Sequence, residues 1–234
     1  MKSYQFISAC ALIAATAGFA APAMATPSES FTLDTWQGST PESGPFGTVT
    51  LNAGSTYVDV DVTLASGDGF VNTGAGDSLD FYLANTSGPI TSIQITGLTT
   101  GFTALNTTAG VTSDGSYSAG GAKGFNYAIH CNACDSGGSN VYTGSLDFAI
   151  GGVTLADFLP SPGKNGGFYF ASDICDGTSG TSPVTCGGTP GQTGPVTAEF
   201  DARSVSVPEP FTLSLFGAGL GGVAALRRRA KKKA

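Results

Sequence analysis

Charged residues are scarce in this sequence, and basic residues are nearly missing from its middle. Asp, Glu, Lys and Arg together make up 12% of the 234 residues, and the chain has one His and one Trp. Between residues 26 and 206 there are 16 acidic residues but only Lys123, Lys164 and Arg203 as basic ones, a net charge of about −13. Such a surface repels phosphate backbones, so nucleic acid is not an expected partner.

The sequence also lacks the common catalytic motifs. One His leaves little from which to build a catalytic triad, and no G-x-S-x-G, H-E-x-x-H or Walker motif is present. Asp59 and Asp61 could serve glycosidic acid–base chemistry. Strand alternation, however, predicts both on an exposed, solvated face. We therefore expect no catalytic residues and no enzyme activity, with a glycan-active enzyme as the remote alternative.

Gly, Ser and Thr are abundant instead. The 35 Gly follow no G-X-Y period, which excludes collagen, and 41% apolar residues with 15 Phe argue against disorder. Period-two alternation is clearest at 57–64, where Val58, Val60 and Val62 share one face. Further strands are predicted, separated by turns rich in Gly, Ser, Asp and Asn, at 46–52, 78–84, 90–96, 123–130, 141–150, 167–174 and 196–202. Residues 153–158 fit a helical turn or another strand. These features predict a single all-β domain at 26–206, a β-sandwich or jelly roll.

The N-terminus has the features of a secretory signal. Lys2 is followed by an apolar run at 6–19, and Ala23 and Ala25 place small residues before Thr26. This pattern predicts a signal peptide at 1–25, removed by signal peptidase during export across the inner membrane. An uncleaved anchor helix is one alternative. Lipidation of Cys10 is another, although the apolar run continues well beyond that residue.

The C-terminus has three parts in a fixed order. Val207, Pro208, Glu209 and Pro210 come first, an apolar segment follows at 211–226, and Arg227, Arg228 and Arg229 come next. A helix of sixteen residues is about 24 Å long, short of a hydrocarbon core of about 30 Å. The terminal cations stay on the cytoplasmic side of the membrane. The segment therefore holds a translocated protein at the bilayer, and a permanent tail anchor is the alternative.

Residues 207–234 resemble the PEP-CTERM sorting signal, in which a Pro-Glu-Pro motif precedes a Gly-containing hydrophobic helix and an Arg cluster. The resemblance implies cleavage near Pro208, Glu209 and Pro210 by an exosortase, a membrane-embedded cysteine transpeptidase. It also implies a Gram-negative owner that makes exopolysaccharide, only transient contact with the membrane, and delivery to the cell surface or the extracellular (biofilm) matrix. The chain departs from the pattern by a further basic extension of Lys231, Lys232 and Lys233.

Apart from Cys10, four cysteines remain, namely Cys131, Cys134, Cys175 and Cys186. An even number in an exported chain predicts two disulfides. Three pairings are possible, and closeness along the chain favours Cys131 with Cys134 and Cys175 with Cys186. A redox-active pair would need a thioredoxin-like context, and a zinc site with four thiolates usually has a tighter second pair.

No cofactor is expected from the motifs. Asp77 and Asp80, and likewise Asp173 and Asp176, border Gly-rich turns and could supply oxygen ligands to a structural calcium ion. None of them has the spacing of an EF-hand loop.

The sequence thus predicts a non-enzymatic structural or adhesive surface protein that is associated with exopolysaccharide. The alternative is a carbohydrate-binding module, in which aromatic side chains stand on a flat sheet. The candidate aromatic residues are Trp36, Tyr57, Tyr82, Tyr127 and Tyr169.

Overall fold

The structure, a computed structural model, describes residues 26–38, 43–85, 88–89, 93–105, 117–134, 140–163, 167–177 and 193–199. This part is built from β-strands and a single 3₁₀ turn, η1 (Leu155–Asp157), which confirms the predicted all-β fold. Within these ranges no helix is long and apolar enough to cross a bilayer. The predicted signal peptide at 1–25 and sorting signal at 207–234 lie outside the described residues.

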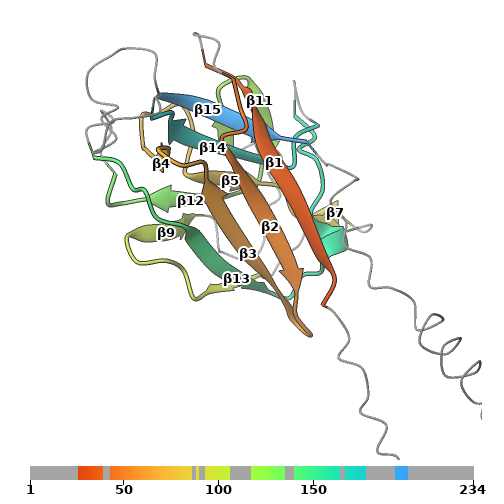
Figure 1. Ribbon diagram of the computed structural model, residues 1–234. Coiled ribbons are helices and arrows are strands. Elements are labelled where there is room, and N and C mark those ends of the chain that lie inside the picture. The colour runs from red at the N-terminus through yellow and green to blue at the C-terminus, as the bar shows by residue number, and fades with distance from the viewer. Residues whose placement is uncertain are drawn as a thin grey trace, which may run out of the picture.

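One eleven-stranded antiparallel sheet dominates the molecule (Figure 1). From one edge to the other its main path consists of β8 (Gln94–Thr96), β13 (Leu146–Gly151), β3 (Tyr57–Leu64), β2 (Gly47–Ala53), β1 (Ser28–Trp36), β15 (Thr193–Ala198), β14 (Phe170–Cys175), β5 (Leu79–Phe81), β12 (Tyr127–Cys131) and β9 (Phe102–Leu105). The short β4 (Gly69–Phe70) pairs with β14 off this path.

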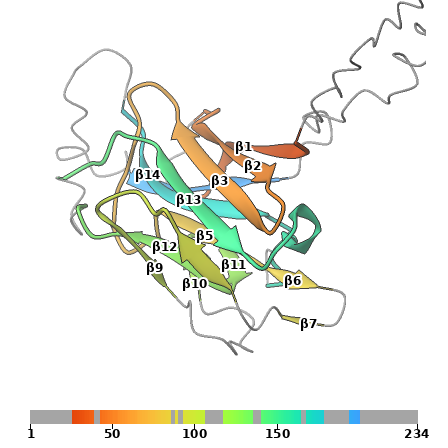
Figure 2. The same cartoon turned by 90° about the horizontal axis from the view of Figure 1, so that it is seen from below.

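The sheet folds over on itself into two layers around one core. Figure 2 shows β1, β2, β3 and β13 on one side and β5, β12 and β9 on the other. Aromatic rings join the layers: the ring centroids of Phe31 and Phe170 lie 5.0 Å apart, and those of Phe81 and Phe148 lie 6.1 Å apart. The result is sandwich-like, as predicted, although a single continuous sheet forms both layers.

Alternation along the strands explains this arrangement. In β3, Val58, Val60 and Val62 are buried, while Tyr57 and the acidic residues between the valines are exposed. A strand with one apolar face gains free energy by turning that face toward the core. The observed bounds of β3 equal the predicted ones.

Other strands differ from prediction where a side chain or an isolated bridge interrupts the ladder. Asn126 separates β11 (Ala122–Phe125) from β12, so the predicted strand 123–130 is divided in two. The predicted strand 141–150 begins only at Leu146, because Tyr142 forms an isolated bridge with Phe70. β1 lies outside the predicted strands, since only Phe31 and Leu33 in it are fully buried.

Two hairpins lie beside the main sheet, β6 (Ala84–Asn85) with β7 (Gly88–Pro89) and β10 (Tyr117–Ala119) with β11. The β10–β11 hairpin packs against the outer face of β5 and β14. Ala119, Ala122 and Phe125 form a small second core there with Ala171 of β14. Side chains on the outer face of these two strands are therefore buried as well.

Candidate functional site

An open groove of about 640 Å³ runs along the outer face of β3, β13 and β8. Its volume lies in the range of small-molecule sites. Nine residues line it: Thr56, Tyr57, Asp59, Ile93, Gln94, Thr96, Ala149, Gly151 and Gly152.

Small residues on the middle strand create the groove. In the ladder, Ala149 of β13 stands between Asp59 and Thr96, and Gly151 stands between Tyr57 and Gln94. The surface is therefore lower along β13, which carries these small residues, than along β3 and β8 on either side, and β13 forms the floor of the groove. An added Cβ at Gly151 would meet only ordinary contacts, the nearest being 3.5 Å to the carbonyl oxygen of Gln94. The glycine therefore leaves space that a side chain could fill.

Tyr57 is the exposed aromatic residue of this groove. It is 40% exposed, the one large hydrophobic side chain in the described ranges with this degree of exposure. Its ring lies closely against Gly54, where an ideal Cβ would be 2.6 Å from ring atoms Cε2 and Cζ. Any larger residue at position 54 would displace the ring, so this position of the tyrosine requires the glycine.

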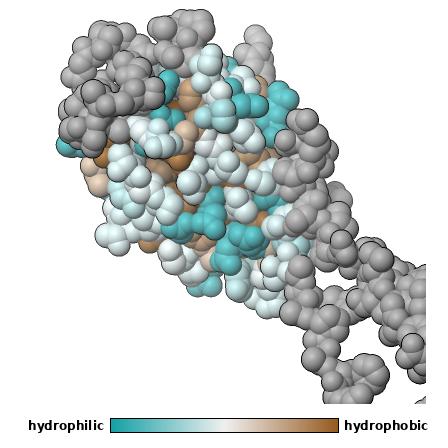
Figure 3. Space-filling model, viewed as in Figure 1, coloured by the Kyte–Doolittle hydropathy of each residue, from teal (hydrophilic) through white to brown (hydrophobic). Residues whose placement is uncertain are grey.

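The surface around the groove is polar. Figure 3 shows hydrophilic colouring over β3, on the face that carries β1, β2 and β3. Asp59, Asp61 and Asp147 contribute exposed carboxylates to this face. A ring beside carboxylate, amide and hydroxyl groups can both stack on an apolar surface and exchange hydrogen bonds with hydroxyls.

The other predicted aromatic residues are held in the fold. Tyr127 is 3% exposed, and its ring stacks on that of Phe81 at 5.7 Å. Tyr169 packs against Phe31 at 5.0 Å, and Trp36 packs against Phe46 at 5.4 Å. Tyr82 packs against the small core below the β10–β11 hairpin. Of the five candidates, the structure therefore leaves Tyr57 as the exposed one.

The first predicted disulfide is confirmed. Cys131 and Cys134 are bonded, with an S–S distance of 2.04 Å and a Cα–Cα distance of 5.4 Å. Cys175 is also disulfide-bonded, and its partner lies outside the described residues. The pairing of Cys175 with Cys186 stays a prediction. An all-β context differs from that of thioredoxin-like redox pairs, which supports a structural role for Cys131 and Cys134.

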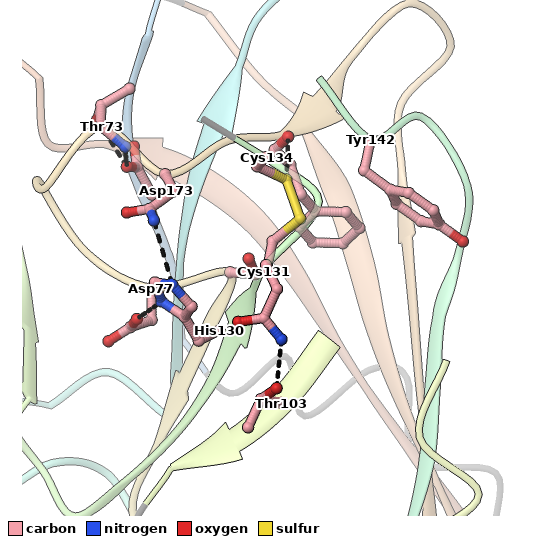
Figure 4. The surroundings of a disulfide bond; sticks show 12 residues. Thr73, Asp77, Thr103, His130, Cys131, Cys134, Tyr142 and Asp173 are labelled. Atoms are coloured by element: carbon pink, nitrogen blue, oxygen red, sulfur yellow. Dashed lines mark hydrogen bonds and ion pairs between the residues drawn. A yellow bond between two sulfur atoms is a disulfide. The ribbon is translucent and has the colours of Figure 1, made fainter. Parts of the chain in front are cut away.

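Beside this disulfide lies a network of polar side chains (Figure 4). His130 Nδ1 is 2.8 Å from Asp77 Oδ1, and its Nε2 is 3.2 Å from Asn72 Nδ2. An amide NH₂ can only donate, so Nε2 accepts and the proton of a neutral ring resides on Nδ1. Both ring nitrogens of His130 are therefore engaged by neighbouring side chains.

The predicted calcium ligands separate into two places. Asp173 Oδ2 accepts hydrogen bonds from Thr73, at 2.8 Å from its backbone nitrogen and 2.6 Å from its Oγ1. The charge of Asp77 contributes to a raised pKa of Asp173, and the charges of Asp77 and Asp173 contribute to a raised pKa of Asp80. These three acids therefore lie close together. Asp176 instead adjoins Asp68, so Asp173 and Asp176 do not share one site.

Burial raises the pKa of Asp68 to about 7. A hydrogen bond from the Gly177 N–H opposes this rise, and the neighbouring Asp176 adds to it. Burial likewise raises the pKa of Asp80 well above its ordinary value, and that of Asp173 to about 6. In the described part of the chain, no three His, Cys, Asp or Glu side chains converge as a metal-ligating set.

Glycoside hydrolysis requires two carboxyl groups roughly 5 to 10 Å apart. Asp59 is the one carboxylate among the residues that line the groove. Asp61 and Asp147 lie farther along the same strands. Their carboxyl groups share a hydrogen bond, so they are closer together than the separation that glycoside hydrolysis requires. Asp59 and Asp61 stand two residues apart on the same exposed face of β3, about 7 Å apart along the strand, and Asp61 is not among the residues that line the groove.

Comparison with protein-family models, curated proteins and solved structures finds no match for this chain. The remaining predicted site residues lie outside the described residues, namely Ala23, Ala25, Cys186, Val207, Pro208, Glu209, Pro210, Arg227, Arg228 and Arg229.

Proposed function

We propose that this chain is an exported bacterial surface protein whose C-terminal segment is a sorting signal removed by an exosortase. The observation that carries the proposal is the order of three elements: Pro208-Glu209-Pro210, the apolar segment 211–226, and the Arg227–229 cluster. The Cys131–Cys134 disulfide supports export, because such bonds persist in oxidising compartments. The mature domain then acts as a non-enzymatic structural or adhesive component associated with exopolysaccharide.

Mass spectrometry of protein recovered from the producing cells tests this proposal. We expect mature material to begin near Thr26 and to end near Glu209, with no peptides from 211–226. Recovery of those peptides from mature protein would show a permanent membrane anchor instead. A variant with alanines at Pro208, Glu209 and Pro210 should accumulate unprocessed. Its matched control, with alanines at Lys231, Lys232 and Lys233, should be processed normally.

The groove favours a second, more specific function, the binding of a polysaccharide chain. Tyr57 carries this proposal, because it is held at the rim of a groove that also presents Asp59, Gln94 and Thr96. Sugar rings have apolar C–H faces and hydroxyl rims, which suit an aromatic ring flanked by such polar groups. The groove is open, as an extended polymer requires.

Titration of the protein with the producer's own exopolysaccharide, followed by calorimetry, tests the binding function. Tyr57→Ala should weaken binding at least about fivefold, since a well-placed ring contributes about 1 kcal/mol or more. Tyr57→Phe should retain most of the affinity. Gly151→Val, which fills the floor, should weaken binding without loss of stability.

Thr63→Ala, on the exposed face of the same strand but outside the groove, is the control. Wild-type protein without measurable affinity would remove the binding proposal and leave the sorting proposal unaffected. Equal affinity in all variants would place binding elsewhere on the molecule.

A further inference from the structure

Two fully buried carboxyl groups lie on the outer face of β5 and β14, away from the groove. Asp80 and Asp173 are both 0% exposed. Leu79 and Phe81 of β5 face the main core, so Asp80, between them, points to the opposite face, under the β10–β11 hairpin. In β14, Ala171 pairs with Asp80, and Asp173 stands two residues farther on the same face. Burying a carboxylate away from water is costly unless another group compensates its charge.

Several oxygen atoms of this region have no hydrogen-bond partner among the described residues. They are Asp80 Oδ1, Asp80 Oδ2, Asp173 Oδ1 and Ser78 Oγ. The backbone N–H of Asp77 lowers the pKa of Asp80, and that of Ala75 lowers the pKa of Asp173, but neither meets hydrogen-bond geometry to the unpaired oxygens. Nearly all buried polar atoms in proteins are paired, so a group of unpaired oxygens indicates a missing partner.

Within the part of the chain that the structure describes, no cation compensates these charges. His130 pairs with Asp77, and Lys123 is exposed on the hairpin. Asp77, the third acid nearby, adds negative charge and raises the pKa values of both buried carboxyls.

The loop before β5 approaches these acids closely. Gly76 lies against the hairpin and Asp80: a Cβ there would be 2.9 Å from the Cβ of Ala119 and 3.5 Å from Asp80 Oδ2. Thr73 in the same loop holds the other oxygen of Asp173. A ligand bound to the free oxygens would therefore tie the loop, the hairpin and the two strands together.

We propose that Asp80 and Asp173, together with the Ser78 hydroxyl, bind a calcium ion between the β10–β11 hairpin and the main sheet. All the donors are oxygens, which calcium and magnesium prefer over zinc. Burial favours calcium over magnesium, because magnesium is reluctant to give up its water ligands. Two carboxylates are few for a calcium site, so the expected dissociation constant is about 10⁻⁴–10⁻³ M, as in extracellular modules.

Calcium titration of the purified full chain, after treatment with a chelator, tests the proposal. Calorimetry should detect one site. Calcium at ten times the dissociation constant should raise the Tm by about 3–6 °C, through preferential binding to the folded state. Magnesium at the same concentration should raise it less. Asp173→Asn and Ser78→Ala should each reduce the affinity at least threefold, and Asp80→Asn should abolish the shift.

Asp61→Asn is the matched control, since it removes an exposed carboxylate from the opposite side of the molecule and should leave the calcium response intact. The proposal fails if wild-type protein shows neither binding heat nor a Tm shift at 10 mM calcium. Asp80 would then be a neutral carboxylic acid, and Asp80→Asn would leave stability unchanged or raised. It also fails if Asp173→Asn and Ser78→Ala respond like wild type, which would place the ion elsewhere. Should Asp80→Asn not fold, these two variants decide.

Discussion

Asp61 and Asp147 stand directly opposite each other on β3 and β13, and their carboxyl groups share a hydrogen bond. Asp147 Oδ2 also accepts a hydrogen bond from Ser145 Oγ, at 2.8 Å, and the backbone N–H of Asp147 donates to Thr99 Oγ1, at 2.8 Å. Asp59 is the remaining charged group nearby, and Thr50 faces Asp61 from β2. In this position Asp61 keeps its proton to a higher pH than an isolated Asp does.

The first prediction concerns pH. The hydrogen bond with Asp147, then burial, then the charges of Asp147 and Asp59 raise the pKa of Asp61 from 3.8 to about 6. The folded state therefore binds this proton more tightly than the unfolded state. The resulting stability is fully present below pH 4 and is lost as the pH rises through 6.

Replacing Asp61 by Asn should remove this contribution and leave those of Asp68 and Asp173, whose pKa values are also raised. At pH 7.5 the variant should be more stable than wild type by about 0.5–1 kcal/mol, a modest gain because solvent screens the exposed pair. Urea denaturation at pH 4, 5, 6 and 7.5 measures the effect, with Thr63→Ala as the uncharged control on the same strand. A variant that keeps the full wild-type slope between pH 4 and 6 would contradict the raised pKa of Asp61.

A second prediction follows from Asn126, which is 2% exposed. Its Nδ2 donates to the Leu83 carbonyl and its Oδ1 accepts from the Leu83 N–H, both at 2.9 Å. Asn126→Ala leaves both backbone groups of Leu83 without this partner and should cost about 2–4 kcal/mol of unfolding free energy. Chemical denaturation measures the loss. Gln37→Ala, which removes a single 3.3 Å hydrogen bond to Thr197, should cost less than about 1 kcal/mol.

The third prediction concerns the Cys131–Cys134 disulfide. It closes a very short loop, so it limits the unfolded chain only modestly, and its loss should cost about 2 kcal/mol. The double variant Cys131→Ala, Cys134→Ala should therefore melt about 4–8 °C lower. Adding a reductant to this variant should lower the Tm further, since Cys175 is also disulfide-bonded. A double variant that melts like wild type would show that the bridge does not limit stability.

The fourth prediction tests the core. The ring of Phe81 contacts four others, those of Tyr127, Phe148, Phe158 and Phe170, at centroid distances of 5.7, 6.1, 6.1 and 6.5 Å. Phe81→Ala should lower the unfolding free energy by about 3–5 kcal/mol, because it leaves a cavity between the layers. Phe81→Leu should cost clearly less. Tyr57→Ala, at the exposed groove, is expected to change stability by less than about 0.5 kcal/mol.

Local sequence patterns predict where the strands lie more successfully than they predict which strands pair with each other. The valines of β3 alternate with polar residues, so the strand and its buried face follow directly from the sequence. The pairing of β1 with β15 joins segments some 160 residues apart, and no local pattern encodes it. Asn126 could be recognised as an interruption only from its contacts with Leu83, which lies 43 residues away.

The candidate sites show the same difference between what local patterns predict and what long-range pairing decides. Tyr57 and Asp59 follow from alternation as exposed residues, but the groove exists because the register places Ala149 and Gly151 between two rows of longer side chains. Asp77, Asp80 and Asp173 are suggested as oxygen ligands by their Gly-rich surroundings. The burial of Asp80 and Asp173 depends on the β10–β11 hairpin, which the strand pattern does not predict as a cover.

The sequence by itself determined the strand-forming pattern of residues 26–206, the buried face of β3 and the closeness of Cys131 to Cys134, because these are properties of residues that are close along the chain. It also carries the N-terminal and C-terminal patterns on which the proposed export depends. Tertiary structure alone decided that Asp61 faces Asp147, and that Asp80 and Asp173 share a buried face. Strand register sets these contacts, and register is fixed by packing the whole core rather than by any one segment.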